Sequence, residues 1–192
     1  MKILRDTLNK IDANIILAEL SDDQLHNKMT CLSKPEYPEV IIPYCMENNK
    51  SIYPFQPNTE EGMNYGKKKD AILKRLKQND IDKSKFETNE TIASIYANQF
   101  MLKCDDLKVL QSEMFDNFFR ADYELTKTLF PQLGELREFW NRSFYKEIDR
   151  KLEVNRDVDR ILITVGLSHK FWLKEQLLQR DDINYKEIGD FL

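Results

Sequence analysis

The sequence predicts an α/β protein, with a mixed sheet, flanking helices and a large helical insert between the N-terminal and C-terminal strands. Two short apolar runs, 14–20 and 160–166, indicate strands near the two ends of the chain. Between them, residues 59–152 carry apolar side chains at helical spacing. A chain of 192 residues with 41% hydrophobic content can bury a sizeable core. We therefore expect a single α/β domain over 1–192, with 59–152 as its helical insert.

The N-terminal segment alternates helical and extended patterns. Residues 2–12 carry leucine and isoleucine at helical spacing and predict a short helix. The run 14–20 is apolar without alternation, which is typical of a strand buried on both faces of a parallel sheet. Ser21 and Gln24 match a capping box and predict the start of the next helix. Residues 33–38 contain two prolines and predict a loop.

Further extended segments complete the expected sheet. Residues 40–44 predict a strand, and Pro43 limits it to a sheet edge or a strand end. Residues 51–55 predict a second short strand. After the run 160–166, a helix is expected over 169–179 and a last strand over 183–188.

The insert is expected to be several helices, with breaks near Asp80–Ser84, Asp105 and Pro131. Its aromatic and aliphatic stripes indicate core contacts between helices more strongly than a cofactor site. The residues expected in these contacts include Ile92, Met114, Phe118, Leu125, Phe139, Trp140, Phe144 and Ile148.

Charge and composition disfavour several partner classes. The net charge is −4, whereas nucleic-acid phosphates require a basic face, so we expect no nucleic-acid partner. The basic run 67–69 has acidic neighbours and is interpreted as a solvated helix face. Only five glycines are present, and no glycine-rich loop indicates a nucleotide cofactor.

Localisation is predicted from cysteines and apolar runs. Cys31, Cys45 and Cys104 are too widely spaced for a zinc motif, and free thiols in a reducing compartment are expected. No run approaches the roughly 20 apolar residues that a membrane helix needs. Charged residues interrupt the N-terminus, which disfavours a signal peptide. We expect a cytoplasmic protein without a membrane partner.

Two residues at strand ends are candidates for chemistry. Glu19 ends the first apolar run, and His169 follows the second through a tight turn that begins at Gly166. Ligands bind at the carboxyl ends of parallel strands, so Glu19 and His169 are expected to face one crevice. Gly166 permits a sharp turn or a close backbone approach. The structural alternatives are a helix-cap partner for Glu19 and a hydrogen-bonded turn residue for His169.

The ordered motifs resemble those of a known superfamily. The segment 160–169, with its Gly-x-x-His, resembles the C-terminal element of the TraB/PrgY, Tiki, GumN and ChaN–erythromycin-esterase-like proteins. Residues 15–20 resemble the first acidic strand of that group. The sequence Trp140-Asn141-Arg142 resembles its helix with a tryptophan and an arginine.

The resemblance implies an α/β core with a cleft, and metal-dependent hydrolysis of peptide or ester-like bonds. Its implied site contains Glu19 as metal ligand or general base, His169 as metal ligand and Arg142 as electrostatic stabiliser. The implied cofactor is one divalent metal ion, and the implied substrate is a small molecule or a peptide. Neither the substrate nor the metal is identified by the sequence.

The sequence departs from the superfamily in one respect. An earlier strand with a first Gly-x-x-His normally precedes the glutamate strand, and it is missing here. The other histidine, His26, lies in a predicted helix and is expected at its surface. Either the chain lacks an N-terminal part, or it is a member without metal chemistry. The alternatives to a hydrolase are a catalytically inactive binding or interaction domain with the same fold and a helical adaptor that uses 59–152.

Overall fold

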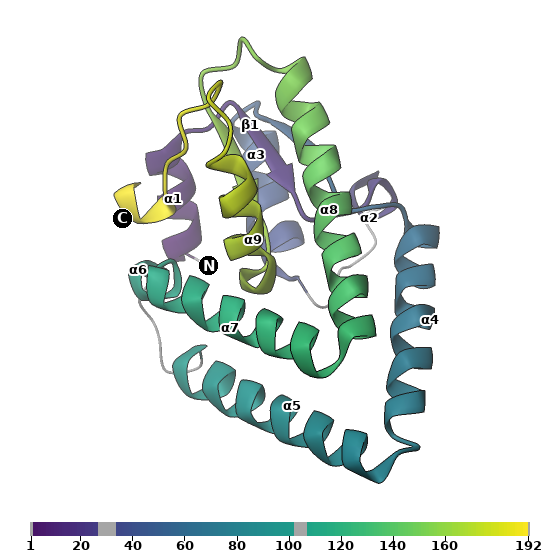
Figure 1. Ribbon diagram of the computed structural model, residues 1–192. Helices are drawn as coiled ribbons and strands as arrows, with labels where there is room; N and C mark the ends of the chain where they lie inside the picture. The colour runs from purple at the N-terminus through teal and green to yellow at the C-terminus, as the bar shows by residue number, and fades with distance from the viewer. Residues whose placement is uncertain (1, 27–33, 102–106, 192) are drawn as a thin grey trace. The chain divides into compact units, whose positions relative to one another are not determined.

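The computed structural model describes the chain apart from residues 1, 27–33, 102–106 and 192 (Figure 1). It is mostly helical and contains a small parallel sheet. The chain divides into two compact units. Unit 1 comprises Met1–Thr59, Arg142–Gly166 and Asp190–Leu192, and unit 2 comprises Glu60–Asn141 and Leu167–Gly189.

The sheet of unit 1 has three described strands in the order β2-β1-β3. The central strand β1 (Ile15–Ala18) pairs in parallel with β2 (Ser51–Pro54) and with β3 (Ile161–Thr164). Every residue of β1 is buried, as its continuous apolar run predicts. The described strands are all parallel, so the expected mixed sheet is wrong in that detail. Helical segments connect successive strands and return the chain to the same end of the sheet.

The first helices of unit 1 agree with the sequence pattern. Helix α1 (Lys2–Ile11) confirms the predicted N-terminal helix. Helix α2 (Asp22–His26) begins with the predicted capping box. The Ser21 N–H donates to Gln24 Oε1 at 2.9 Å, and the Gln24 N–H donates to Ser21 Oγ at 3.3 Å. Helix α1 and strand β1 can be followed in purple in Figure 1.

The strand predicted over 40–44 is wrong, and the predicted loop over 33–38 ends early. The chain instead forms the π-helix η1 (Tyr37–Ile41), followed by α3 (Ile42–Glu47). The spacing of the buried residues places them on one face of these helices. They are Tyr37, Val40, Ile41, Tyr44 and Cys45. Pro43 lies in the first turn of α3, directly after the π-helix η1, in which the Ile42 N–H donates to the Tyr37 carbonyl. Burial of one face thus outweighs the extended preference of a β-branched run.

The helical insert consists of consecutive helices, as predicted. The break expected near residue 80 lies slightly earlier, at 77–79, the break at Pro131 is confirmed, and the one at Asp105 lies outside the described residues. The described helices are α4 (Thr59–Leu76), α5 (Asp80–Met101), α6 (Leu107–Leu110), α7 (Glu113–Leu129) and α8 (Pro131–Val154). The division between the units falls within α8, after Asn141. Helix α9 (Leu167–Leu177) confirms the helix predicted after the last strand and packs against α7.

The turn between α7 and α8 depends on a glycine. A Cβ atom at Gly134 would lie 2.7 Å from the Cα of Lys127, which is closer than such atoms approach. Gly134 therefore allows the first turn of α8 to contact the last turns of α7.

The predicted core of the insert is confirmed only in part. Trp140, Phe144 and Ile148 are buried, and Phe118 is half-buried. Ile92, Met114, Leu125 and Phe139 are instead 48%, 52%, 44% and 59% exposed. Helical periodicity predicts which residues share a face, but a helix buries only the stripe that its neighbours cover.

The strand predicted over 183–188 is wrong. The chain is irregular there and ends in the 3-10 helix η2 (Ile188–Phe191). The Glu187 carboxylate instead forms ion pairs with Lys170 and Lys174 of α9. Side chains therefore attach this segment to unit 2, without a backbone ladder.

None of the described helices combines the length and the apolarity that crossing a membrane requires.

Candidate functional site

The predicted site residues lie in different parts of the chain. Glu19 directly follows β1 at the carboxyl end of the sheet and is 7% exposed. Arg142 lies on the part of α8 that belongs to unit 1, and it is exposed. His169 lies in the first turn of α9 in unit 2 and is half-buried. Because Glu19 and His169 belong to different units, their expected common crevice stays a prediction.

The main chain of Glu19 is fixed at the ends of two neighbouring segments. Its N–H donates to the carbonyl of Thr164 at 3.1 Å and lies 3.0 Å from the Tyr37 hydroxyl oxygen. The Tyr37 hydroxyl donates to the same Thr164 carbonyl at 3.0 Å and lies 3.1 Å from Thr164 Oγ1. Tyr37 thus joins the end of β1 to the end of β3.

Burial raises the pKa of the Tyr37 hydroxyl far above its ordinary value of 10.0. The hydroxyl therefore stays protonated at neutral pH and acts as a hydrogen-bond donor. Tyr37 opens the π-helix η1, an element that is rare and often found at functional sites. The sequence pattern had placed Tyr37 in a loop, so this contact was not predicted.

The carboxylate of Glu19 binds two donors. Its Oε2 accepts the backbone N–H of Gly166 at 2.6 Å. Its Oε1 forms an ion pair with the ammonium of Lys34 at 2.9 Å. None of the described glycines has a positive φ, and Gly166 contributes its backbone N–H as a donor to the Glu19 carboxylate.

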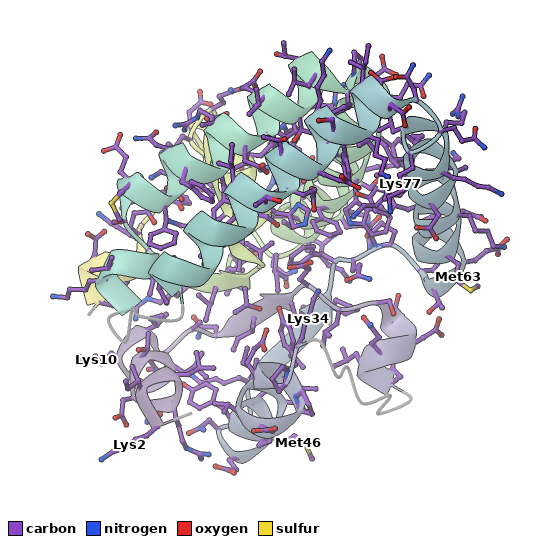
Figure 2. The ribbon with its side chains drawn as sticks, turned by 90° about the horizontal axis from the view of Figure 1, so that it is seen from below. Lys2, Lys10, Lys34, Met46, Met63 and Lys77 are labelled. Atoms are coloured by element: carbon purple, nitrogen blue, oxygen red, sulfur yellow. The ribbon has the colours of Figure 1, made fainter. Side chains whose placement is uncertain are left out.

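The ammonium of Lys34 contacts three oxygen atoms, which we call the ammonium cage. These are the Glu19 backbone oxygen at 2.6 Å, Glu19 Oε1 at 2.9 Å and Gln56 Oε1 at 3.2 Å. An ammonium has three N–H bonds, so each can have an acceptor here. The Lys34 side chain is 21% exposed and the Glu19 side chain 9% exposed. Figure 2 labels Lys34 and Met46, which both belong to unit 1.

In unit 2, the imidazole of His169 contacts an asparagine. His169 Nδ1 lies 2.6 Å from Oδ1 of Asn141, on the last turn of α8 before the division between the units. Asn141 is fully buried, with 0% exposed. With the amide oxygen as acceptor, Nδ1 carries the proton and Nε2 carries the lone pair. That tautomer suits a general base or a metal ligand.

The amide nitrogen of Asn141 has no hydrogen-bond partner among the described residues. An unsatisfied buried donor costs about 1–3 kcal/mol. Asn141 is part of the motif that resembles the superfamily helix, but the resemblance implies no role for it. A polar residue next to Trp140 on a buried stripe is the signal that could have identified it.

Neighbouring contacts anchor both residues of this pair. Trp140, next to Asn141, stacks on Tyr65 with ring centroids 4.5 Å apart. Lys170, next to His169, donates to Asp116 Oδ1 at 3.0 Å and to the carbonyl of Gln111 at 2.9 Å. Asp116 is 3% exposed. These contacts fix the helical positions that carry Asn141 and His169.

The metal implied by the resemblance fits only one of its two predicted ligands. Metal-binding histidines usually donate their other ring N–H to an oxygen, which matches His169 and Asn141. The Glu19 carboxylate is already bound by the Lys34 ammonium and does not fit a second cation. Within the described parts of the chain, no three histidine, cysteine, aspartate or glutamate side chains form a group suited to a metal ion.

The remaining candidates are structural. His26 is exposed beside Asp22, with its Nε2 3.8 Å from Oδ1, which confirms its predicted surface position. Cys45 is a buried free thiol, and burial raises its pKa from 9.0 to about 11. Cys31 and Cys104 lie outside the described residues.

Comparison with protein-family models, with curated proteins and with solved structures gave no match.

Proposed function

We propose that this protein is a hydrolase of the TraB/Tiki/erythromycin-esterase type, in which His169 is the general base. The supporting observation is the 2.6 Å contact between His169 Nδ1 and Oδ1 of the fully buried Asn141. A buried oxygen on Nδ1 leaves the lone pair on Nε2, where it can accept a proton. The substrate class, an ester or peptide bond, comes from the resemblance of the sequence motifs.

In the proposed reaction, Nε2 of His169 removes a proton from water as the water oxygen attacks the carbonyl carbon. Asn141 holds the ring in position while the imidazolium forms, and the proton then passes to the leaving group. Asn141 is neutral, so it orients the ring without the added charge stabilisation that an aspartate would give. Base catalysis of this kind contributes about 10²- to 10⁴-fold to a rate.

The implied metal is an alternative to this base, because the single lone pair on His169 Nε2 cannot both bind an ion and accept a proton. In that version His169 Nε2 would hold a divalent ion, which would polarise the substrate carbonyl. Glu19 as ligand or base and Arg142 as electrostatic stabiliser remain predictions of the resemblance. No step of the proposed reaction requires them.

The test is hydrolysis of a panel of 4-nitrophenyl esters and fluorogenic peptides. We expect His169→Ala to lower kcat/KM about 100-fold or more. His26→Ala is the matched control, because it removes the other histidine, which is exposed. Equal rates for His169→Ala and the unchanged protein would contradict the proposal. Bound metal, measured on the same samples by mass spectrometry, and its loss in His169→Ala would identify the metal-dependent version.

The second candidate is a catalytically inactive binding domain with the same fold. It is favoured by the bonding of Glu19, whose carboxylate is bound to Lys34 and to the Gly166 N–H. It predicts no hydrolysis of the panel and no stoichiometric metal. Hydrolysis that is lost in His169→Ala would exclude it.

A further inference from the structure

We propose that the carboxyl edge of the unit 1 sheet is a binding site for a primary ammonium group, which the protein fills with its own Lys34. The site is the ammonium cage formed by the Glu19 backbone oxygen, Glu19 Oε1 and Gln56 Oε1. It lies where open parallel sheets bind their ligands. This inference uses unit 1 alone and is independent of the proposed hydrolase activity.

The distances in the cage match those of a bound ammonium. Its oxygens lie 2.6, 2.9 and 3.2 Å from Lys34 Nζ. Hydrogen bonds from N–H groups span about 2.7–3.2 Å, whereas calcium binds oxygen at about 2.3–2.6 Å and magnesium at about 2.0–2.1 Å. Two of the distances lie in the hydrogen-bond range and the third is slightly shorter, so an ammonium fills the cage, and its oxygens would have to move inward to bind magnesium.

The charge of the cage also favours a primary ammonium over a divalent ion. One cage oxygen belongs to the Glu19 carboxylate, and the other two are neutral carbonyl oxygens. A single positive charge balances this set, whereas a divalent ion would leave one charge uncompensated in a partly buried position. Three acceptors also match the three N–H bonds of a primary ammonium.

The two Glu19 oxygens of the cage and the backbone of Gln56 are held in place without Lys34. Glu19 is fixed through its N–H by the Thr164 carbonyl and through its Oε2 by the Gly166 N–H. The backbone N–H of Gln56 donates to the carbonyl of Leu20 at 3.0 Å. The site is thus preorganised, and a small molecule with a primary amine is the class of ligand that can displace Lys34.

The proposal is tested by chemical rescue of Lys34→Ala. This variant vacates the cage and is expected to unfold at a lower temperature than the unchanged protein. Ethylammonium or propylammonium chloride should raise its Tm by about 3 °C or more beyond sodium chloride at equal ionic strength. Tetramethylammonium chloride should not, because it has no N–H bond to donate. Equal effects of all these salts would overturn the proposal.

Lys50→Ala is the matched control. Lys50 also forms an ion pair in unit 1, but among the described residues its partner is a single exposed carboxylate, that of Asp12. We expect primary amines to give this variant no stabilisation beyond sodium chloride. Selective rescue of Lys50→Ala as well would mean a general amine effect and would also overturn the proposal.

A measurement on the unchanged protein covers the case in which Lys34→Ala does not fold. In spectra of ¹⁵N-labelled lysine ammonium groups, the Lys34 protons should exchange with water more slowly than those of the similarly buried Lys50, because Lys34 has three described acceptors and Lys50 has one. Added propylammonium chloride should accelerate the exchange at Lys34, whereas tetramethylammonium chloride should not. Exchange at Lys34 as fast as at Lys50, or without a response to propylammonium, would overturn the proposal.

Discussion

The carboxyl edge of the unit 1 sheet and the histidine pair of unit 2 both bury polar side chains, but they satisfy them to different degrees. At the sheet edge, the Glu19 carboxylate, the Lys34 ammonium and the Tyr37 hydroxyl each have hydrogen-bond partners. In unit 2, Asn141 is fully buried, and its amide nitrogen has no partner among the described residues.

The difference separates stability from function. A satisfied network holds segments together, and removing one member leaves the others unpaired. An unsatisfied buried donor weakens the fold, so its presence points to another role, here the orientation of His169. The sheet edge should therefore respond to substitution through the free energy of unfolding. Substitutions in the Asn141–His169 pair should instead change the protonation of His169 and the rate of hydrolysis.

The largest loss is expected for Glu19→Ala. The change leaves the Lys34 ammonium without its anion and the Gly166 N–H without its acceptor, which should cost about 3 kcal/mol of unfolding free energy. Urea denaturation measures this. Glu47→Ala is the control, because it breaks an exposed ion pair with Arg5 and should cost less than about 1 kcal/mol. Equal losses of unfolding free energy in the two variants would contradict the stabilising role of the sheet edge.

A smaller loss is expected for Tyr37→Phe. The variant removes the hydroxyl that donates to Thr164 and lies beside the Glu19 N–H. The free energy of unfolding should fall by about 2 kcal/mol. Tyr44→Phe is its control, because the equally buried Tyr44 makes one described hydroxyl bond, to the carbonyl of Leu8 at 3.1 Å. We expect about 1 kcal/mol there. A larger loss in Tyr44→Phe would contradict the importance given to Tyr37.

Alkaline pH should weaken unit 1 through Cys45. Burial raises the pKa of this thiol from 9.0 to about 11, so the unfolded chain loses the proton first. The stabilisation is complete below pH 9 and is lost as the pH rises toward 11. Between pH 8 and pH 10, the loss should be on the order of 1 kcal/mol by urea denaturation. A Cys45→Ala variant should lose this contribution, and an unchanged pH dependence in that variant would refute the assignment.

The smallest effect on stability is expected for Asn141→Leu. The substitution removes an unsatisfied buried donor and keeps a similar volume, so unfolding free energy should change by less than about 1 kcal/mol. The histidine should respond instead. In ¹⁵N spectra, His169 of the unchanged protein should carry its proton on Nδ1, and the variant should shift it toward Nε2. His26 serves as the internal reference, being the only other histidine in the sequence. A loss of unfolding free energy above about 3 kcal/mol, with an unchanged His169 tautomer, would mean that Asn141 stabilises the fold and does not orient His169.

Local patterns in the sequence were enough to predict much of the fold. The apolar run of β1, the helical spacing of α1 and the capping box of α2 each involve residues within a few positions of one another. These elements follow from backbone preferences, local capping and burial patterns that involve only neighbouring residues. The positions of Glu19 and His169 just after two strands were predicted in the same way.

The tertiary structure alone decided which side chains meet. Tyr37 contacts Thr164 across 127 positions of the chain, and Lys34 contacts Gln56 across 22. No periodicity connects residues at such separations, so neither the ammonium cage nor the Asn141–His169 pair was predicted. Packing against other elements also decided that 40–44 is helical and that Phe139 is exposed. The sequence by itself determines which segments can form helices and strands, whereas partners distant in the chain determine which of their faces are buried and which polar atoms are paired.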